Sequence, residues 1–99
     1  MKKLEKEFTG VGEVKGFGFK QIASNGYAFI YEVKQPMVDE SYYEVFERRV
    51  NTQYNCESYP SRKAFGIWAF CCISYERAQE IYKKLSQRVK AHKDAEFQD

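Results

Sequence analysis

Two phenylalanines and a lysine near the start of the chain have the residue types and spacing of a base-stacking site. In the stretch KGFGF, Lys15 is followed by Phe17 and Phe19, which alternate with glycines. Side chains two positions apart on a strand share one face, so the two rings would lie side by side. Exposed rings beside a cation can stack nucleobases, at about 1–3 kcal/mol per base. The alternative is that both rings form the core face of a packed strand.

KGFGF resembles the start of the RNA-binding strand signature found in RNA-recognition motifs and in cold-shock domains. That resemblance implies a strand whose rings contact single-stranded RNA or DNA. In RNA-recognition motifs the signature lies on the third strand, which the short segment before Lys15 cannot accommodate. Lys20 and Ile22 also replace an aliphatic and an aromatic residue of that signature. The resemblance to cold-shock domains adds only the segment Gly12-Glu13-Val14-Lys15, which overlaps KGFGF.

A second group of candidate binding residues combines tyrosine with arginine in the middle of the chain. These two residue types are the ones favoured at the energetic centres of protein interfaces. Further rings follow KGFGF on the next predicted strand. The candidate residues for binding a partner or a nucleic acid are Lys15, Phe17, Phe19, Tyr27, Tyr31, Arg48, Arg49, Tyr59, Arg62 and Lys63.

Residue types that usually carry catalysis or bind a metal are few and scattered. His92 is the only histidine, and it falls in a basic stretch that predicts a solvated helix end. The three cysteines form neither a C-x-x-C pair nor a disulfide framework. Cys56 lies near basic residues but has no accompanying base, and Glu44 and Glu47 have no acid-base spacing. We therefore predict a non-enzymatic protein with no catalytic site, metal site or cofactor.

The composition predicts one small domain with more rings than its core needs. The 99 residues are 43% hydrophobic and 30% charged, which is ordinary for a folded soluble domain. The aromatic fraction of 17% suggests that some rings lie at a surface or interface. A net charge of +2 leaves only local basic clusters to attract nucleic acid. No signal peptide or membrane-spanning stretch is predicted, and the cysteine usage fits a reducing cytoplasm.

Turn signals and periodicity predict the elements that must position these residues. A glycine-rich strand over residues 10–22 meets a second strand, residues 27–33, through the hairpin signal Ser24-Asn25-Gly26. Pro36 then interrupts regular pairing in a loop. Residues 41–50 have the aromatic and β-branched content of a strand, although their spacing also fits a helix.

The last part of the chain predicts a buried strand followed by a helix. Residues 64–73, AFGIWAFCCI, are apolar on both faces, which is typical of a central strand covered by a helix and by a second subunit. Ser74 then caps an amphipathic helix whose apolar residues recur at helical spacing. Residues 94–99 are predicted to be a disordered tail, so the domain spans residues 1–93.

The predicted fold is α+β: a four-stranded antiparallel sheet followed by one C-terminal amphipathic helix packed on one face, β-β-β-β-α. The segments YEV, YEVF, ESYP and AFGIWAF resemble small uncharacterised proteins of bacterial phages and mobile elements, which implies an accessory protein and no particular activity. We predict a binding or accessory domain that acts through protein contacts, as a homodimer or with another protein. The alternative is a single-stranded DNA- or RNA-binding protein that uses the aromatic sheet face and basic loop residues.

Overall fold

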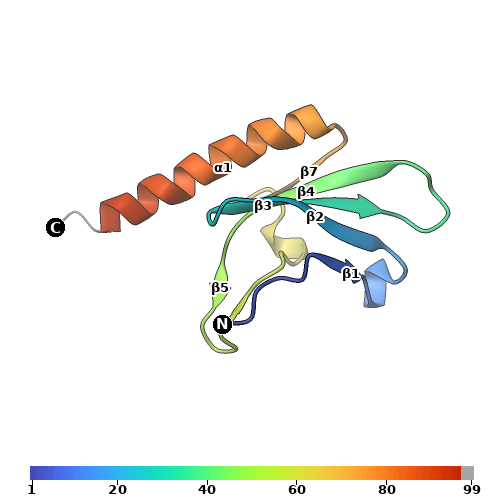
Figure 1. Cartoon of the computed structure of the whole chain (residues 1–99), viewed down its shortest axis with the longest axis horizontal. Coiled ribbons are helices and arrows are strands. Elements are labelled where there is room, and N and C mark those ends of the chain that lie inside the picture. The colour runs from blue at the N-terminus through green and yellow to red at the C-terminus, as the bar shows by residue number, and fades with distance from the viewer. Residues whose placement is uncertain (97–99) are drawn as a thin grey trace.

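The fold is an antiparallel sheet with one long helix, α1 (Tyr75–Glu96), lying across one face (Figure 1). The computed structural model describes the backbone of residues 1–96 and the side chains of residues 1–93. Each strand of the five-stranded sheet is antiparallel to its neighbours. In spatial order the strands are β1 (Glu7–Thr9), β2 (Gly18–Ser24), β3 (Ala28–Lys34), β4 (Ser41–Glu47) and β7 (Ala69–Cys72). The predicted α+β class, antiparallel sheet and C-terminal helix are confirmed, with one more strand than predicted.

The hairpin between β2 and β3 forms at the predicted turn. Gly26 has a φ of +85°, a left-handed conformation that favours glycine. The Asn25 side-chain oxygen accepts hydrogen bonds from the backbone N–H groups of Tyr27 and Ala28, at 2.9 and 3.0 Å. The strand before this turn is shorter than predicted, because its first part forms the 3₁₀ helix η1 (Gly12–Val14). The glycines of the predicted first strand therefore serve turns as well as pairing.

β4 is a strand, as its residue types predict, and the chain leaves the sheet after Glu47. A separate two-stranded hairpin follows, formed by β5 (Val50–Asn51) and β6 (Cys56–Glu57). The 3₁₀ helix η2 (Arg62–Ala64) comes next. These short elements carry residues 48–68 across the face of the sheet opposite α1 (Figure 1).

The prediction of a central strand over residues 64–73 is wrong. β7 is the only strand within this segment, and it lies at the edge of the sheet beside β4. The preceding residues form a tight turn, because the backbone N–H groups of Ile67 and Trp68 both donate to the Ala64 carbonyl at 3.0 Å. Gly66 has a φ of +92° within this turn. Ala64, Phe65 and Trp68 of this segment pack against the sheet, whereas Ile67 in the turn is 66% exposed.

α1 begins where the sequence predicts it. The Ser74 hydroxyl accepts a hydrogen bond from the backbone N–H of Arg77 at 3.2 Å, which caps the first turn. Ala78 and Leu85 on its apolar side pack in a cluster with aliphatic residues of β3 and β4. No helix in the described part of the chain has the length and hydropathy that crossing a membrane requires.

The predicted tail, residues 94–99, begins inside this helix. α1 continues through residue 96, so its last turn occupies the first half of the predicted tail. Residues 97–99 lie outside the described part of the chain. The apolar stripe of α1 ends earlier, which is why residue pattern alone placed the end of the helix too soon.

The face of the sheet opposite α1 is covered by the chain itself. Its core is largely aromatic, in contrast to the aliphatic cluster under α1. The N-terminal segment and the segment that contains η2 lie across it (Figure 1). A second subunit, which the sequence suggested here, is not needed to bury this core. The buried members of this cluster are Phe19, Phe29, Tyr31, Val33, Phe46, Ala64 and Ala69.

Candidate functional site

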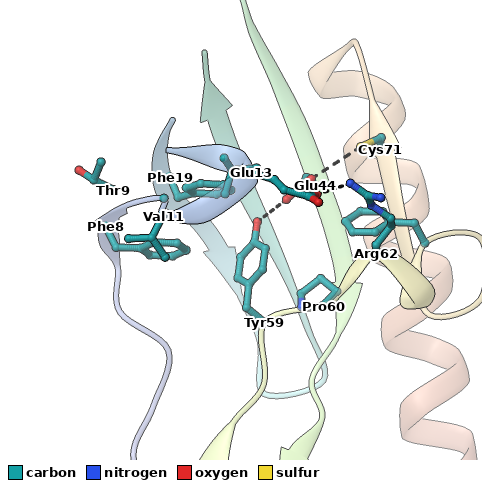
Figure 2. A pocket seen from close by; sticks show the side chains of 13 residues that line it. Phe8, Thr9, Val11, Glu13, Phe19, Glu44, Tyr59, Pro60, Arg62 and Cys71 are labelled. Atoms are coloured by element: carbon teal, nitrogen blue, oxygen red, sulfur yellow. Dashed lines mark hydrogen bonds and ion pairs between the residues drawn. The ribbon is translucent and has the colours of Figure 1, made fainter. Parts of the chain in front are cut away.

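A pocket of about 490 Å³ opens on the aromatic face of the sheet. It lies between η1, the segment that leads into η2, and β7 (Figure 2). A volume of this size is within the usual range for sites that bind small molecules or side chains, about 300–1,000 Å³. Its walls are mostly apolar. They are formed by Phe8, Val11, Val14, Phe19, Pro60 and Phe65.

Glu44 of β4 is the buried acidic group of this pocket, and its residue surface is only 9% exposed. The Tyr59 hydroxyl donates a hydrogen bond to Glu44 Oε1 at 2.6 Å. The Cys71 thiol donates a longer one to Glu44 Oε2 at 3.8 Å. Figure 2 shows both groups directed at the carboxyl from different segments. Sheet register brings Cys71 to this place, because it lies directly opposite Glu44 on the neighbouring strand.

The surroundings of Glu44 disfavour a negative charge. Burial raises the pKa of Glu44, because the carboxylate loses water, and the hydrogen bonds from Tyr59 and Cys71 offset only part of this effect. Burial also raises the pKa of Tyr59 far above its usual range, and the nearby Glu44 charge adds to the shift. Among the residues that the structure describes, no ion pair involves Glu44. The pocket therefore holds a carboxyl without an ion-pair partner among the described residues, although Arg62 also lines the pocket.

The Cys71 thiol is also held in its protonated form. Burial of the thiol, followed by the charge and hydrogen bond of Glu44, raises the pKa of Cys71 to about 11. Although the residue as a whole is exposed at the sheet edge, its sulfur faces the carboxyl. The thiolate is the nucleophilic form of cysteine, so this thiol is a poor nucleophile at neutral pH. Within the described chain, no group of three or more possible ligands could hold a metal ion.

An ion pair between Arg62 and Glu13 spans the mouth of the pocket (Figure 2). Both side chains are largely exposed, at 83% and 77% of their surfaces. An exposed pair of this kind contributes little to the free energy of folding. It nevertheless keeps the Arg62 charge engaged with Glu13 at the surface.

Two of the rings predicted to stack on nucleobases belong to the core. Phe19 is 6% exposed and stacks on Phe8, with the ring centroids 4.7 Å apart. Tyr31 is fully buried, and its hydroxyl donates to the Glu5 carbonyl at 2.7 Å and accepts from Gln21 Nε2 at 2.9 Å. A base could reach the face of Tyr31 only if the core opened.

Of the remaining candidate aromatic residues and lysines, Tyr59 lines the pocket and the others lie elsewhere. Phe17 and Tyr27 are half-buried, and the Lys93 ammonium lies 5.3 Å from the centroid of the Tyr27 ring. Lys15 and Lys63 are exposed and do not line the pocket. Phe17, Tyr27, Lys15 and Lys63 are therefore not part of the pocket lining.

Two of the three candidate arginines have structural roles. Arg48 Nε donates to Glu57 Oε2 at 2.6 Å, and the other oxygen of Glu57 accepts the backbone N–H of Leu4 at 2.8 Å. This arrangement attaches the N-terminal segment to β6. Arg49 Nη2 donates a hydrogen bond to Glu47 Oε1 at 2.9 Å and forms an ion pair with this buried carboxylate. Only the third candidate, Arg62, lies at the pocket.

Glu44 was not among the predicted site residues, because its spacing from Glu47 does not suggest catalysis. The residue pattern of β4 nevertheless indicates where its side chain lies. In β4, SYYEVFE, alternate residues share a face, so Glu44 lies between Tyr42 and Phe46 on the core side. A carboxyl placed between two rings in a buried strand is a candidate functional group.

The pocket combines a concave shape, apolar walls and a few convergent polar groups, which is typical of binding sites. No family model, curated protein or solved structure matches this chain. The chemistry of the pocket is therefore the basis for a functional proposal, because a fold class alone does not specify function.

Proposed function

We propose that this protein is a small non-enzymatic binding domain and that the pocket around Glu44 is its binding site. The supporting observation is a buried carboxyl in an apolar pocket, with a phenol and a thiol as its partners. Burying an ionisable group without a counter-charge costs folding free energy. Groups kept in such surroundings cluster at functional sites.

Binding accounts for the pocket better than catalysis does. A nucleophilic mechanism needs an activated side chain, and Cys71, with its thiol pKa raised to about 11, is protonated at neutral pH. Burial likewise keeps the Tyr59 phenol protonated by raising its pKa. Glu44 can exchange a proton, but neither neighbour is an activated nucleophile.

The mouth of the pocket favours a partner that covers it, such as another protein. Val11 on the approach to η1 is 81% exposed, and Val14 within η1 is 37% exposed. Both valines line the pocket. A partner that fills the pocket would remove these apolar side chains from water, at about 25 cal/mol per Å² of apolar surface.

Chemical-shift mapping tests whether the pocket binds ligands. We expect small aromatic compounds to shift the amide resonances of pocket residues such as Val11 and Phe65 in ¹H–¹⁵N spectra. Cys71→Phe places a ring at the pocket edge and should abolish these shifts. Ile73→Phe is the matched control, because Ile73 is 91% exposed and lies outside the pocket. Binding that survives Cys71→Phe, or shifts confined to other surfaces, would contradict the proposed site.

Single-stranded nucleic-acid binding is the second candidate, and the exposed basic residues on α1 favour it. Lys83, Lys84 and Lys90 are exposed and could contact phosphates. The buried state of Phe19 and Tyr31 weighs against a stacking platform. Fluorescence anisotropy with labelled oligonucleotides at low and high salt is the test. Salt-sensitive binding that Lys83→Glu with Lys84→Glu removes would support this candidate, and no binding at low salt would eliminate it.

Self-association is a further proposal, and an open edge of the sheet supports it. Ala64, Ala69 and Cys72 are buried within their own chain, whereas Ile67 and Ile73 of the same segment are 66% and 91% exposed. β7 has no neighbour on its outer side among the strands that the structure describes. A free edge can pair with a second copy. Light scattering would report twice the mass of one chain if this pairing occurs.

A further inference from the structure

We propose that the ligand of the Glu44 pocket carries a cation, namely a primary ammonium on an apolar or aromatic stem, which forms an ion pair with the Glu44 carboxylate. This inference rests on the proposed function of the pocket as a binding site and names the chemistry of its ligand. Hydrogen-bonding capacity, charge and ring placement each support it.

The Glu44 carboxyl has acceptor capacity left after its contacts within the chain. Each oxygen accepts one hydrogen bond, from the Tyr59 hydroxyl and from the Cys71 thiol. An ionised carboxylate offers roughly four acceptor positions, so about two remain. An ammonium group carries three N–H donors and can fill them. The donors already present fix the orientation of the carboxyl before a ligand arrives.

The charges around the pocket favour a cation over an anion. Its formally charged residues are Glu13, Glu44 and Arg62. Glu13 and Arg62 are paired at the mouth, as Figure 2 shows, which leaves one negative charge inside when Glu44 ionises. An anion would be repelled by this charge, and Arg62, the cation that lines the pocket, is already paired with Glu13. A cation gains the attraction without breaking that pair.

The rings of the pocket provide a fixed apolar wall for the stem of such a ligand. Phe8 and Phe19 stack with an interplanar angle of 5°, and Tyr59 contacts both of them edge-on at centroid distances of 5.5 Å. Phe65 completes the aromatic lining. Aromatic rings also attract cations, because the face of the ring carries partial negative charge. Because the rings support one another, little side-chain ordering is required on binding.

Ligand binding should be linked to the ionisation of Glu44. Burial raises the Glu44 pKa in the empty pocket, and an ammonium favours the carboxylate, so binding releases a proton. Affinity should therefore rise with pH through that pKa and then level off. Tyr42, Tyr59 and Cys71, which face the carboxyl, stay protonated over this range because their own pKa values are raised. A ligand that needs the neutral acid would show the opposite slope.

Three compounds of similar shape distinguish a cationic ligand from a neutral or an anionic one: benzylamine, benzyl alcohol and benzoate. Titrations followed by ¹H–¹⁵N spectra of the whole chain should show benzylamine binding about tenfold more tightly than either of the others near neutral pH. Glu44→Gln should remove this preference. Glu40→Gln removes the same charge from an exposed residue outside the pocket; it is the matched control and should keep the preference. The pH profile of the wild-type protein provides a second readout if Glu44→Gln fails to fold.

The outcomes distinguish the ligand class from the site itself. Benzyl alcohol or benzoate binding as tightly as benzylamine would overturn the cation and leave the pocket as a binding site. No binding of any of the three compounds would overturn both proposals. A blocked lysine, N-acetyl-lysine methylamide, identifies the source of the cation. If it binds more tightly than benzylamine, a lysine of a protein partner is indicated, whereas the reverse order indicates a free small amine.

Discussion

Two glutamates on β4 are both buried, yet the protein surrounds them in opposite ways. Glu47 is 6% exposed, and its carboxylate contacts the guanidinium groups of Arg49 and Arg88, each at 2.9 Å. Glu44 is 9% exposed, and among the described side chains its carboxyl accepts hydrogen bonds from the Tyr59 phenol and the Cys71 thiol and forms no ion pair. The first arrangement compensates the charge within the chain. The second leaves the charge without an ion-pair partner among the described residues, so burial alone does not show whether an acid is compensated within the chain.

The difference follows from which face of the sheet each residue occupies. Because three positions separate them, their side chains point to opposite faces. Glu47 lies on the face covered by α1, whose regular spacing places Arg88 against it. Glu44 lies on the face covered by irregular segments, which supply rings and leave a pocket. The helix-covered face supplies a cation to its acid, whereas the other face has a pocket beside its own.

Removing the cations from Glu47 should have the largest effect. We expect Arg49→Ala combined with Arg88→Ala to lower the free energy of unfolding by about 3 kcal/mol near neutral pH, because it leaves a buried carboxylate unpaired. Urea denaturation measures this loss. Lys84→Ala combined with Lys90→Ala removes the same charge from exposed positions and is the control. Arg88→Ala alone separates the ion pair from the stack of Arg49 on Trp68, at 4.8 Å. A loss no larger than that of the control would contradict the structural role of Glu47.

Tyr59→Phe should be the next largest change. It removes the donor to Glu44 and keeps the ring contacts with Phe46, at 4.8 Å between centroids. The unfolding free energy should fall by about 1–2 kcal/mol, since a buried acceptor loses its partner. Thermal and urea unfolding both report it. Tyr54→Phe removes a hydroxyl from a residue that is 72% exposed and should have no measurable effect.

Glu44→Gln should change the pH dependence of stability more than stability itself. Burial raises the folded-state pKa of Glu44 above its ordinary value of 4.5. Its stabilising contribution is therefore complete below the unfolded pKa and is lost as pH rises through the folded pKa. Relative to wild type, the Gln variant should gain stability from acidic toward neutral pH. Melting temperatures measured across that range test the sign. A constant difference between the two proteins would show that Glu44 does not titrate as described.

The smallest expected effect is on the reactivity of Cys71. With its pKa raised to about 11, the thiol should alkylate slowly near neutral pH although the residue is exposed. Glu44→Gln removes the charge that contributes to this shift and should speed labelling several-fold. Mass spectrometry in a Cys56→Ser background follows the reaction, since Cys72 is buried. An unchanged rate would mean that the carboxyl does not control the thiol.

The sheet and helix could be predicted because their signals are local. The Asn25-Gly26 turn, the alternation in β4 and the cap at Ser74 each depend on a few neighbouring residues. The short β7 could not be predicted, because an apolar run does not show where a turn interrupts it. A long-range contact also shapes the glycine-rich region, where a side chain on Gly16 would meet the Pro36 ring at 3.0 Å.

The candidate site was less predictable than the fold. The alternation of β4 places Glu44 on the core face, so its position could be inferred. Its partners could not, because Tyr59 and Cys71 are 15 and 27 residues away in sequence. Phe19 and Tyr59 line the pocket and are among the residues that the sequence suggests for binding, but sequence pattern cannot separate a wall of a pocket from an exposed stacking surface. That distinction depends on how the irregular segments cross the sheet.

The position of α1 bears on how this protein can be handled. The helix lies on the opposite side of the sheet from the Glu44 pocket (Figure 1). A sensor chip or fluorophore coupled through an exposed lysine of α1, such as Lys84 or Lys90, would leave the pocket mouth facing solution. Anchored in this way, the domain offers its aromatic side to whatever flows past it.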